Sequence, residues 1–381
     1  MMWKLAIRSW ILPCLPLFFL VGCRGEEVVV SPVAGRNGRF LSHDTYYDKL
    51  YGAWQATMVA NHTGLDFQGI YLDEPGAGDS IELLLLDEWS TDDDTHVEWV
   101  DLHILETHGL EPSYEQIRDE WVDHLNNDIW VSALRARQLM DEGIVPPQTS
   151  DPALNPEGVW SIGAQLQTEL FGLIAPELPD EAMRRARRFA RVTNSGLAVE
   201  ASAFYAHMYA NAFFESDVPT LINLAKADFA PDSQIYAIVY NVQQWHRASP
   251  NDWRQTRQQI RDAYDDDPMW WASKVNFATT IMALLYGEGD MIDTLTIAAL
   301  AGWDADNNMT TAVGLLGIIS GYDNLPDPIR TSTDIYFNQD VTGDLPQYDS
   351  VSNIARRTQM LGELAVQQAG GTISTTGIQI P

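Results

Sequence analysis

Apolar and polar positions follow a helical pattern from about residue 44 onward. In THVEWVDLHILETHG (95–109) the apolar residues recur with helical spacing, and the run stops at Gly109. The same pattern recurs in SYEQIRDEWVDHLNN (113–127). Both segments are therefore predicted to form amphipathic helices.

Further helices are predicted where the same periodicity runs between clusters of Pro, Gly, Asp and Asn. They span 160–174, 180–193, 197–215, 218–227, 233–247, 251–264, 270–286, 290–301 and 308–320. Alternating β-branched runs are nearly absent, and no solenoid repeat is evident. The fold class is predicted as all-α, with a single domain over residues 41–369 and a flexible Gly- and Thr-rich tail at 370–381.

The first 22 residues lack the helical pattern of a globular domain. A short basic start precedes an apolar run that is interrupted by prolines, which is typical of an export signal. The segment LVGC (20–23) resembles the bacterial lipoprotein box, in which Cys23 is lipidated; the alternative is a secretory signal with an incidental cysteine. A membrane-anchored protein of the bacterial cell envelope is expected, at the outer membrane because Arg24 follows Cys23, with 23–40 as a tether.

Composition narrows the functional classes. The chain has 381 residues, 45% of them hydrophobic, so it can bury a sizeable core. Its formal net charge is −30, from 53 acidic and 23 basic residues. Nucleic acid binding is excluded on this ground, because a nucleic acid partner needs a basic surface to neutralise its phosphates. An excess of carboxylates favours cation binding, and a monomer is expected.

Three consecutive carboxylates, Asp92, Asp93 and Asp94, stand between Thr91 and Thr95 at the start of a predicted helix. Acids at this position can cap free backbone N–H groups and complement the helix dipole. One or two acids suffice for that, and each further like charge costs repulsion unless a cation offsets it. Taken alone, the triplet is compatible with capping and with a divalent metal.

A second acidic cluster favours the metal. In AGWDADNNMTTAVGLLGIISG (301–321) two aspartates precede a helix of small and apolar residues. The segment is no EF-hand, because Met309 and Leu315 stand where the calcium loop needs Gly and Glu. Oxygen ligands suit Mg²⁺ or Mn²⁺, and neither cysteines nor clustered histidines are evident to favour zinc. Two facing clusters would hold two ions.

Several segments, in this order, resemble the ADP-ribosylglycohydrolase family over most of residues 47–321. The resemblance implies the family's all-α orthogonal bundle and its two-metal hydrolysis of an ADP-ribosyl bond. The matching segments are YGAWQATMVANHTGLDFQG (51–69), DDDT (92–95), residues 162–196, FYAHMYANAFF (204–214) and LLYGEGDMIDTLTIAALAGWD (284–304), which leads into GWDADN (302–307).

The resemblance also implies roles for single residues. Those implied as metal ligands are Asp92, Asp93, Asp94, Asp304, Asp306 and Asn307. Those implied to contact substrate are Gly163, Gln165 and Asn194. The chain departs from the family pattern at four of its positions: Asp92 replaces a Thr, Asn307 replaces a Ser or Thr, Gln68 replaces an acidic residue, and Asn194 stands at or near a usual His.

The leading hypothesis is a glycohydrolase with two Mg²⁺ or Mn²⁺ ions that cleaves the N- or O-glycosidic bond of a free or protein-linked ADP-ribosyl or related ribosyl conjugate. Asp93 or Asp94 would take a proton from the attacking water. The first alternative is a binding module that has lost catalysis, favoured by Gln68. The second keeps hydrolysis but changes the substrate. Trp270 and Trp271 fit either a ligand stack or the core.

Overall fold

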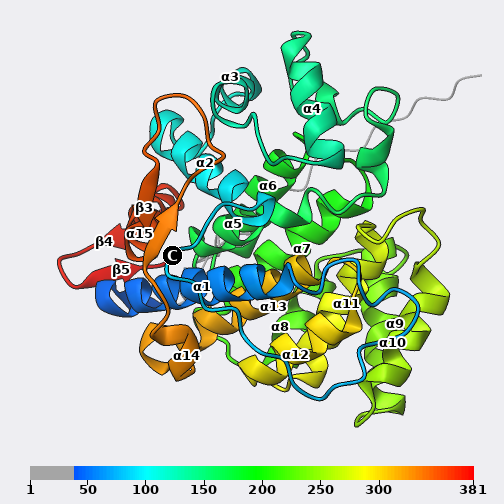
Figure 1. Ribbon diagram of the computed structural model, residues 1–381. Helices are drawn as coiled ribbons and strands as arrows, with labels where there is room; N and C mark the ends of the chain where they lie inside the picture. The colour runs from blue at the N-terminus through cyan, green and yellow to red at the C-terminus, as the bar shows by residue number, and fades with distance from the viewer. Residues whose placement is uncertain (1–37) are drawn as a thin grey trace, which may run out of the picture. The chain divides into compact units, whose positions relative to one another are not determined.

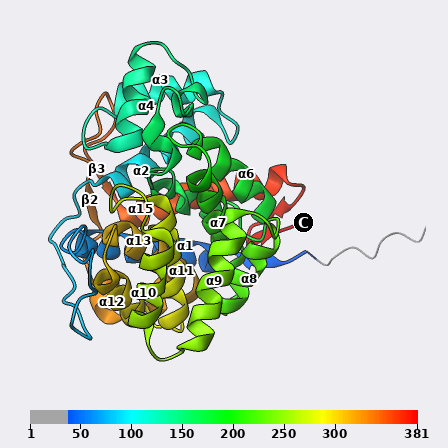
Figure 2. The ribbon, with the colours of Figure 1, turned by 90° about the vertical axis from the view of Figure 1, so that its right-hand side faces the viewer.

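The computed structural model of the protein describes residues 38–381, so the signal segment, Cys23 and almost all of the tether lie outside the described residues. Fifteen α-helices form this part, which confirms the all-α class (Figure 1). They are α1 (His43–Gly64), α2 (Asp93–His108), α3 (Tyr114–His124), α4 (Val131–Asp141), α5 (Glu169–Leu173), α6 (Pro179–Ala190), α7 (Leu197–Asn211), α8 (Val218–Ala227), α9 (Gln234–Ala248), α10 (Trp253–Tyr264), α11 (Ser273–Tyr286), α12 (Met291–Ala301), α13 (Ala305–Ser320), α14 (Asp327–Arg330) and α15 (Val351–Gln368). In both views α3 and α4 lie at the top and α10 and α12 at the bottom (Figures 1 and 2).

Helices α1 and α13 cross in the core with their backbones in close contact. A Cβ atom added to Gly52 would lie 2.7 Å from the carbonyl oxygen of Gly317, and one added to Gly317 would lie 2.5 Å from the carbonyl oxygen of Gly52. Only glycine fits on both sides of such a crossing. The small-residue character of both segments therefore follows from how closely the two helices pack.

Within residues 38–381 two small antiparallel sheets accompany the helices. One has the order β1 (Phe40–Ser42), β5 (Gly377–Gln379) and β4 (Thr372–Ile373), and the other pairs β2 (Ile335–Phe337) with β3 (Tyr348–Ser350). The prediction of a flexible tail from residue 370 is wrong. The tail forms two strands, β5 pairs with β1 at the other end of the described chain, and Ile378 and Ile380 are fully buried.

Most predicted helices are present, but the single helix expected at 160–174 is not. That stretch holds the 3₁₀ turn η3 (Gln165–Gln167) and the short α5. The first part of the stretch has irregular backbone, because it bonds to the segment before α11. The Ile162 N–H donates to the Trp271 carbonyl at 2.9 Å, and the Ser273 N–H donates to the Trp160 carbonyl at 2.7 Å. Helices α4, α14 and α15 were not predicted.

Helix α2 is more deeply placed than an amphipathic surface helix. Glu98 and Asp101 lie on its polar side, yet both are buried. Burial raises the pKa of both carboxyls well above the usual range, with the neighbouring Glu169 adding to the effect on Glu98. The helix thus passes through the interior, and its two ends reach different polar sites.

Within residues 38–381, none of the helices combines the length and the apolar character needed to cross a membrane.

Candidate active site

A cavity of about 410 Å³ opens where α2 and α13 begin. Carboxylates from both helices line it, together with aromatic side chains from two loops. The lining residues are Gln68, Asp92, Asp93, Asp94, Asp128, Trp130, Val131, Ser132, Ser161, Ile162, Gly163, Leu166, Trp270, Trp271, Asp304 and Asp306. The two acidic clusters, some 210 residues apart in sequence, thus share one cavity.

The three aspartates at the start of α2 make different contacts. Asp92 is the N-cap: its Oδ2 accepts the Asp94 N–H at 3.2 Å, and Thr95 completes a capping box. Asn61 Nδ2, on α1, also donates to Asp92 Oδ2 at 2.8 Å. Capping therefore accounts for Asp92, whereas Asp93 and Asp94 are left to face the cavity.

Asp304 occupies the corresponding N-cap position of α13 but makes no side-chain capping bond. Its backbone N–H donates to Asn276 Oδ1 at 3.0 Å, which fixes the turn. The preceding Trp303 has φ +57°, a left-handed conformation that is uncommon for a non-glycine residue. The helix thus starts with a carboxylate that its own backbone does not use.

The end of α1 is shaped to let α13 approach. A Cβ atom added to Gly64 would lie 2.3 Å from the Cα atom of Asp306. No side chain larger than hydrogen fits between the two backbones without a shift. Gly64 therefore sets the depth at which Asp306 enters the cavity.

One hydrogen bond joins the two clusters directly: Asn307 Nδ2 donates to Asp94 Oδ1 at 2.7 Å. Burial, followed by the mutual repulsion of the carboxylates, raises the pKa of Asp93, Asp94 and Asp304 well above the usual range. For Asp306 burial and then the charge of Asp92 raise the pKa to about 7. Carboxylates buried this close together can remain ionised only if a cation lies beside them.

The residues present fit a divalent metal. Asp92, Asp93 and Asp94 each offer a carboxylate oxygen, and these oxygens lie within 4.8 Å of one another. Asp306 adds a buried Oδ1 atom with no hydrogen-bond partner among the described residues. A buried acceptor without a donor is what a cation would satisfy, and an all-oxygen donor set matches hard ions such as Mg²⁺ and Mn²⁺.

The residues predicted to contact substrate are divided between the cavity wall and the layer behind it. Gly163 lines the cavity, and a Cβ atom there would lie 2.5 Å from Ser132 Oγ. Asn194 is buried behind the wall, where its Nδ2 donates to the Ser161 carbonyl at 2.9 Å and its Oδ1 accepts from Ser132 Oγ at 3.0 Å. Gln165 lies there too, bonded to Ser273 Oγ at 2.5 Å. Both hold the loops that form the wall.

Sequence reasoning missed the loop between α3 and α4, which supplies Asp128, Trp130 and Val131. Asp128 and Val131 have φ of +47° and +46°, and Trp130 is 61% exposed. The run NNDIW (126–130), turn-forming residues followed by a large aromatic, was the available signal. Trp270 and Trp271, which fitted a ligand stack or the core, also line the cavity.

A larger and more open hollow, of about 820 Å³, lies beside α6 and α7. It shares no lining residue with the acidic cavity, and its charged side chains include the ion pair of Arg187 and Glu200 at 2.8 Å. Size alone therefore does not identify the site; the convergent carboxylates do.

The family profile described as ADP-ribosylglycohydrolase matches residues 42–363, which include every one of these carboxylates. The chain belongs to the ADP-ribosylglycohydrolase family. One solved structure with the same fold is an "ADP-ribosylglycohydrolase-related protein complex", with a TM-score of 0.58 and 17% sequence identity over 84% of this chain and 99% of that one. None of the curated proteins compared with the chain matches it.

Membership of the ADP-ribosylglycohydrolase family supports a glycohydrolase-type function. The fold-level match adds the architecture and no activity, because its identity is low. The departures at Gln68, Asp92 and Asn307 all fall in or beside the carboxylate cavity. What this ADP-ribosylglycohydrolase relative hydrolyses therefore has to be argued from its own site.

Proposed function

We propose that the protein hydrolyses the glycosidic bond of an ADP-ribosyl or related ribosyl conjugate, with two Mg²⁺ or Mn²⁺ ions held by its acidic clusters. The observation that supports this most is the shared cavity of Asp93, Asp94, Asp304 and Asp306. A ribosyl unit with an attached phosphate or base fits the size class of a cavity of about 410 Å³.

Five carboxylates and one amide would hold the ions. They are Asp92, Asp93, Asp94, Asp304, Asp306 and Asn307, which offers its amide oxygen because its Nδ2 is bonded to Asp94. Bound Mg²⁺ supplies electrostatic polarisation of the oxygens around it. Substitution of Asp for Thr at position 92 adds a negative charge, which favours cation binding further.

Asp93 is the proton acceptor in this proposal. Asp94 already accepts the Asn307 amide on Oδ1, so its orientation is fixed. Among the described residues Asp93 has no side-chain hydrogen bond of this kind, and its carboxylate can accept the proton of a water attacking the ribosyl C1″ carbon. Trp130 and Trp271 offer flat apolar surfaces that would stack on a base and exclude bulk water.

The test is a screen of ADP-ribosyl, nucleoside and glycosyl conjugates with the purified protein in Mg²⁺, Mn²⁺ or EDTA. We expect release of the free sugar from at least one ribosyl conjugate, lost in EDTA and in Asp93→Asn. Turnover that survives EDTA would contradict the metal. No turnover of any conjugate, with ADP-ribose bound, would favour the alternative below.

The alternative is a binding module that holds an ADP-ribosyl-like ligand without cleaving it. Gln68 favours this function, because it lines the cavity where the family pattern has an acidic residue and it offers only a neutral carbonyl. Gln68→Glu separates the two functions. If catalysis has been lost through Gln68, the variant gains turnover on a conjugate that the wild type only binds; if the wild type is an enzyme, both turn it over.

We also propose that the protein is a lipid-anchored component of the cell envelope. The support is the LVGC segment (20–23), with Cys23 as the acceptor of the lipid. Cys23→Ser should move the protein from the detergent phase to the aqueous phase in a detergent partition. Unchanged partitioning would contradict the anchor.

A further inference from the structure

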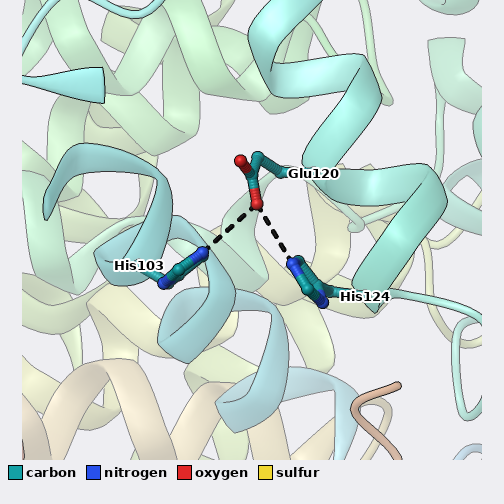
Figure 3. A group of neighbouring side chains, drawn as sticks. All are labelled: His103, Glu120 and His124. Carbon is teal, nitrogen blue, oxygen red and sulfur yellow. Dashed lines mark ion pairs between the residues drawn. The ribbon is translucent and has the colours of Figure 1, made fainter. Parts of the chain in front are cut away.

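Helices α2 and α3 bring together three side chains, His103 from α2 and the i, i+4 pair Glu120 and His124 from α3 (Figure 3). His103 Nε2 lies 3.2 Å from Glu120 Oε2, and His124 Nε2 lies 3.1 Å from the same oxygen. The three ligand atoms all lie within 4.8 Å of one another. The sequence-based view that clustered histidines are lacking is therefore wrong for the folded chain.

His124 shows why the cluster needs a cation. Its Nδ1 lies 2.8 Å from the carbonyl oxygen of Thr342, which only accepts hydrogen bonds, so Nδ1 carries a proton. In the neutral ring Nε2 is then a bare lone pair, and it points at a carboxylate oxygen, which is a second acceptor. Two acceptors 3.1 Å apart repel each other unless a proton or a metal ion lies between them.

The spacing fits a metal. Bonds of about 2.0 to 2.1 Å in a tetrahedral site place neighbouring ligand atoms roughly 3.3 Å apart, close to the 3.2 and 3.1 Å observed. The Thr342 carbonyl is the usual outer partner of a ligating histidine. His103 and His124 both face the same Glu120 oxygen, an arrangement that one ion bound by all three groups would account for (Figure 3).

A third histidine holds the carboxylate in place. His108 Nε2 lies 2.7 Å from Glu120 Oε1, the oxygen that the other two rings do not use. The charged neighbours Glu106 and Arg357 pair with each other at 2.7 Å and leave Glu120 to the histidines. Side-chain exposure is 23% for His103, 15% for Glu120 and 6% for His124, so an ion can enter from solvent while the ligands stay mostly dry.

We propose that His103, Glu120 and His124 bind one divalent transition-metal ion, with Zn²⁺ as the best match, and that His108 is a positioning residue for Glu120. Two imidazoles and one carboxylate suit Zn²⁺ and disfavour Mg²⁺ and Ca²⁺. The site joins α2 to the end of α3, and the chain runs from His124 directly into the loop that bears Asp128 and Trp130. The ion would thus tie α2 to the end of α3 without lining the acidic cavity.

The experiment separates this site from the acidic one. In the full chain carrying Asp304→Asn and Asp306→Asn, equilibrium dialysis against Zn²⁺ should still find one tightly bound equivalent. Co²⁺ in its place should give the intense visible absorption of a tetrahedral nitrogen and oxygen site. Adding His103→Gln should remove the bound equivalent and the absorption, and His108→Gln should weaken binding about 10- to 100-fold, as losses of outer-shell partners do.

His246→Gln is the matched control, because His246 packs edge-on against Tyr286 away from the cluster and should leave Zn²⁺ binding unchanged. If the double Asp variant does not fold, the wild type in saturating Mg²⁺ replaces it, and the extra Zn²⁺ equivalent is counted there with and without His103→Gln. Absence of that equivalent, or its persistence in His103→Gln, would overturn the proposal.

Discussion

Helix α2 carries two polar clusters of different chemical character, one at its N-terminus and one in its C-terminal half. Asp93 and Asp94 join other carboxylates, all oxygen ligands, whereas His103 joins a single carboxylate and two further imidazoles. Ten residues of helix separate them, roughly 15 Å. In the first cluster like charges accumulate, and the pKa values of Asp93 and Asp94 rise; the second cluster holds one carboxylate beside three imidazoles.

One rigid helix thus presents hard oxygen ligands at one end and borderline nitrogen ligands towards the other, at two separate clusters. Carboxylates crowded together call for divalent charge, which Mg²⁺ supplies, while imidazole nitrogens select a transition metal. Because α2 is buried along most of its length, its two ends cannot shift independently. The predictions below ask whether the two ends differ in function as they differ in chemistry.

The largest expected effect is on turnover. Asp93→Asn should lower kcat by about 10² to 10⁴, the usual range for loss of a proton-accepting group, whereas His103→Gln should change kcat in Mg²⁺ by no more than about twofold. Steady-state kinetics on whichever ribosyl conjugate is cleaved measure both. Equal losses in the two variants would show that the ends of α2 form one functional unit.

Metal should stabilise the acidic end by mass action. At about 100 times its dissociation constant Mg²⁺ adds about 2.7 kcal/mol to the free energy of unfolding. Thermal unfolding with Mg²⁺ and with EDTA measures the gain, and Asp306→Asn should abolish most of it. His108→Gln serves as the control at the other end of the helix and should retain the Mg²⁺ gain in full.

Gly64→Ala should disturb the acidic end alone. The added Cβ would lie 2.3 Å from Asp306 Cα, and overpacking of this kind costs about 1 to 3 kcal/mol. Chemical denaturation should show that loss together with weaker Mg²⁺ binding. Gly78→Ala is the control, since its Cβ meets nothing closer than 3.4 Å. Unchanged Mg²⁺ affinity in Gly64→Ala would mean that Asp306 does not depend on this contact.

Trp130→Ala should have the smallest effect. The side chain is 61% exposed, so the free energy of unfolding should change by less than about 0.5 kcal/mol. Loss of a stacking surface worth about 0.5 to 1.5 kcal/mol should raise KM for a conjugate with a base by about 2- to 10-fold. A conjugate without a base should show no such rise. If it does, Trp130 shapes the loop and makes no ligand contact.

The helical pattern and the two acidic runs could be read from the sequence because each lies within one short segment. The 160–174 stretch was not predictable in the same way, since its irregular backbone depends on hydrogen bonds to residues 271 and 273. The tail was expected to be loose because its pairing partner, β1, lies at the other end of the described chain.

Short sequence motifs also did not reveal residues whose role depends on contacts between distant segments. Glu120 and His124 have the i, i+4 spacing of two ligands on one helix face, but the third ligand, His103, comes from another helix, so α3 alone does not reveal the site. The NNDIW run indicates a turn at Asp128 but not that this side chain reaches the cavity, because its direction is set by a left-handed backbone that sequence does not reveal for a non-glycine residue. The family resemblance implied that Asp92 is a metal ligand, and helix capping was the alternative for the triplet; the structure confirms that Asp92 caps α2.

The glycine crossing of α1 and α13 has a consequence for biosynthesis. About 240 residues separate the end of α1 from the start of α13, and at about 5 to 20 residues per second their synthesis takes roughly 12 to 50 s. During that interval the nascent chain holds α1 without its main packing partner, and the apolar surface that α13 later covers is open to aggregation or chaperones. Chains truncated before residue 305 should therefore be far more sensitive to protease within α1 than the full chain.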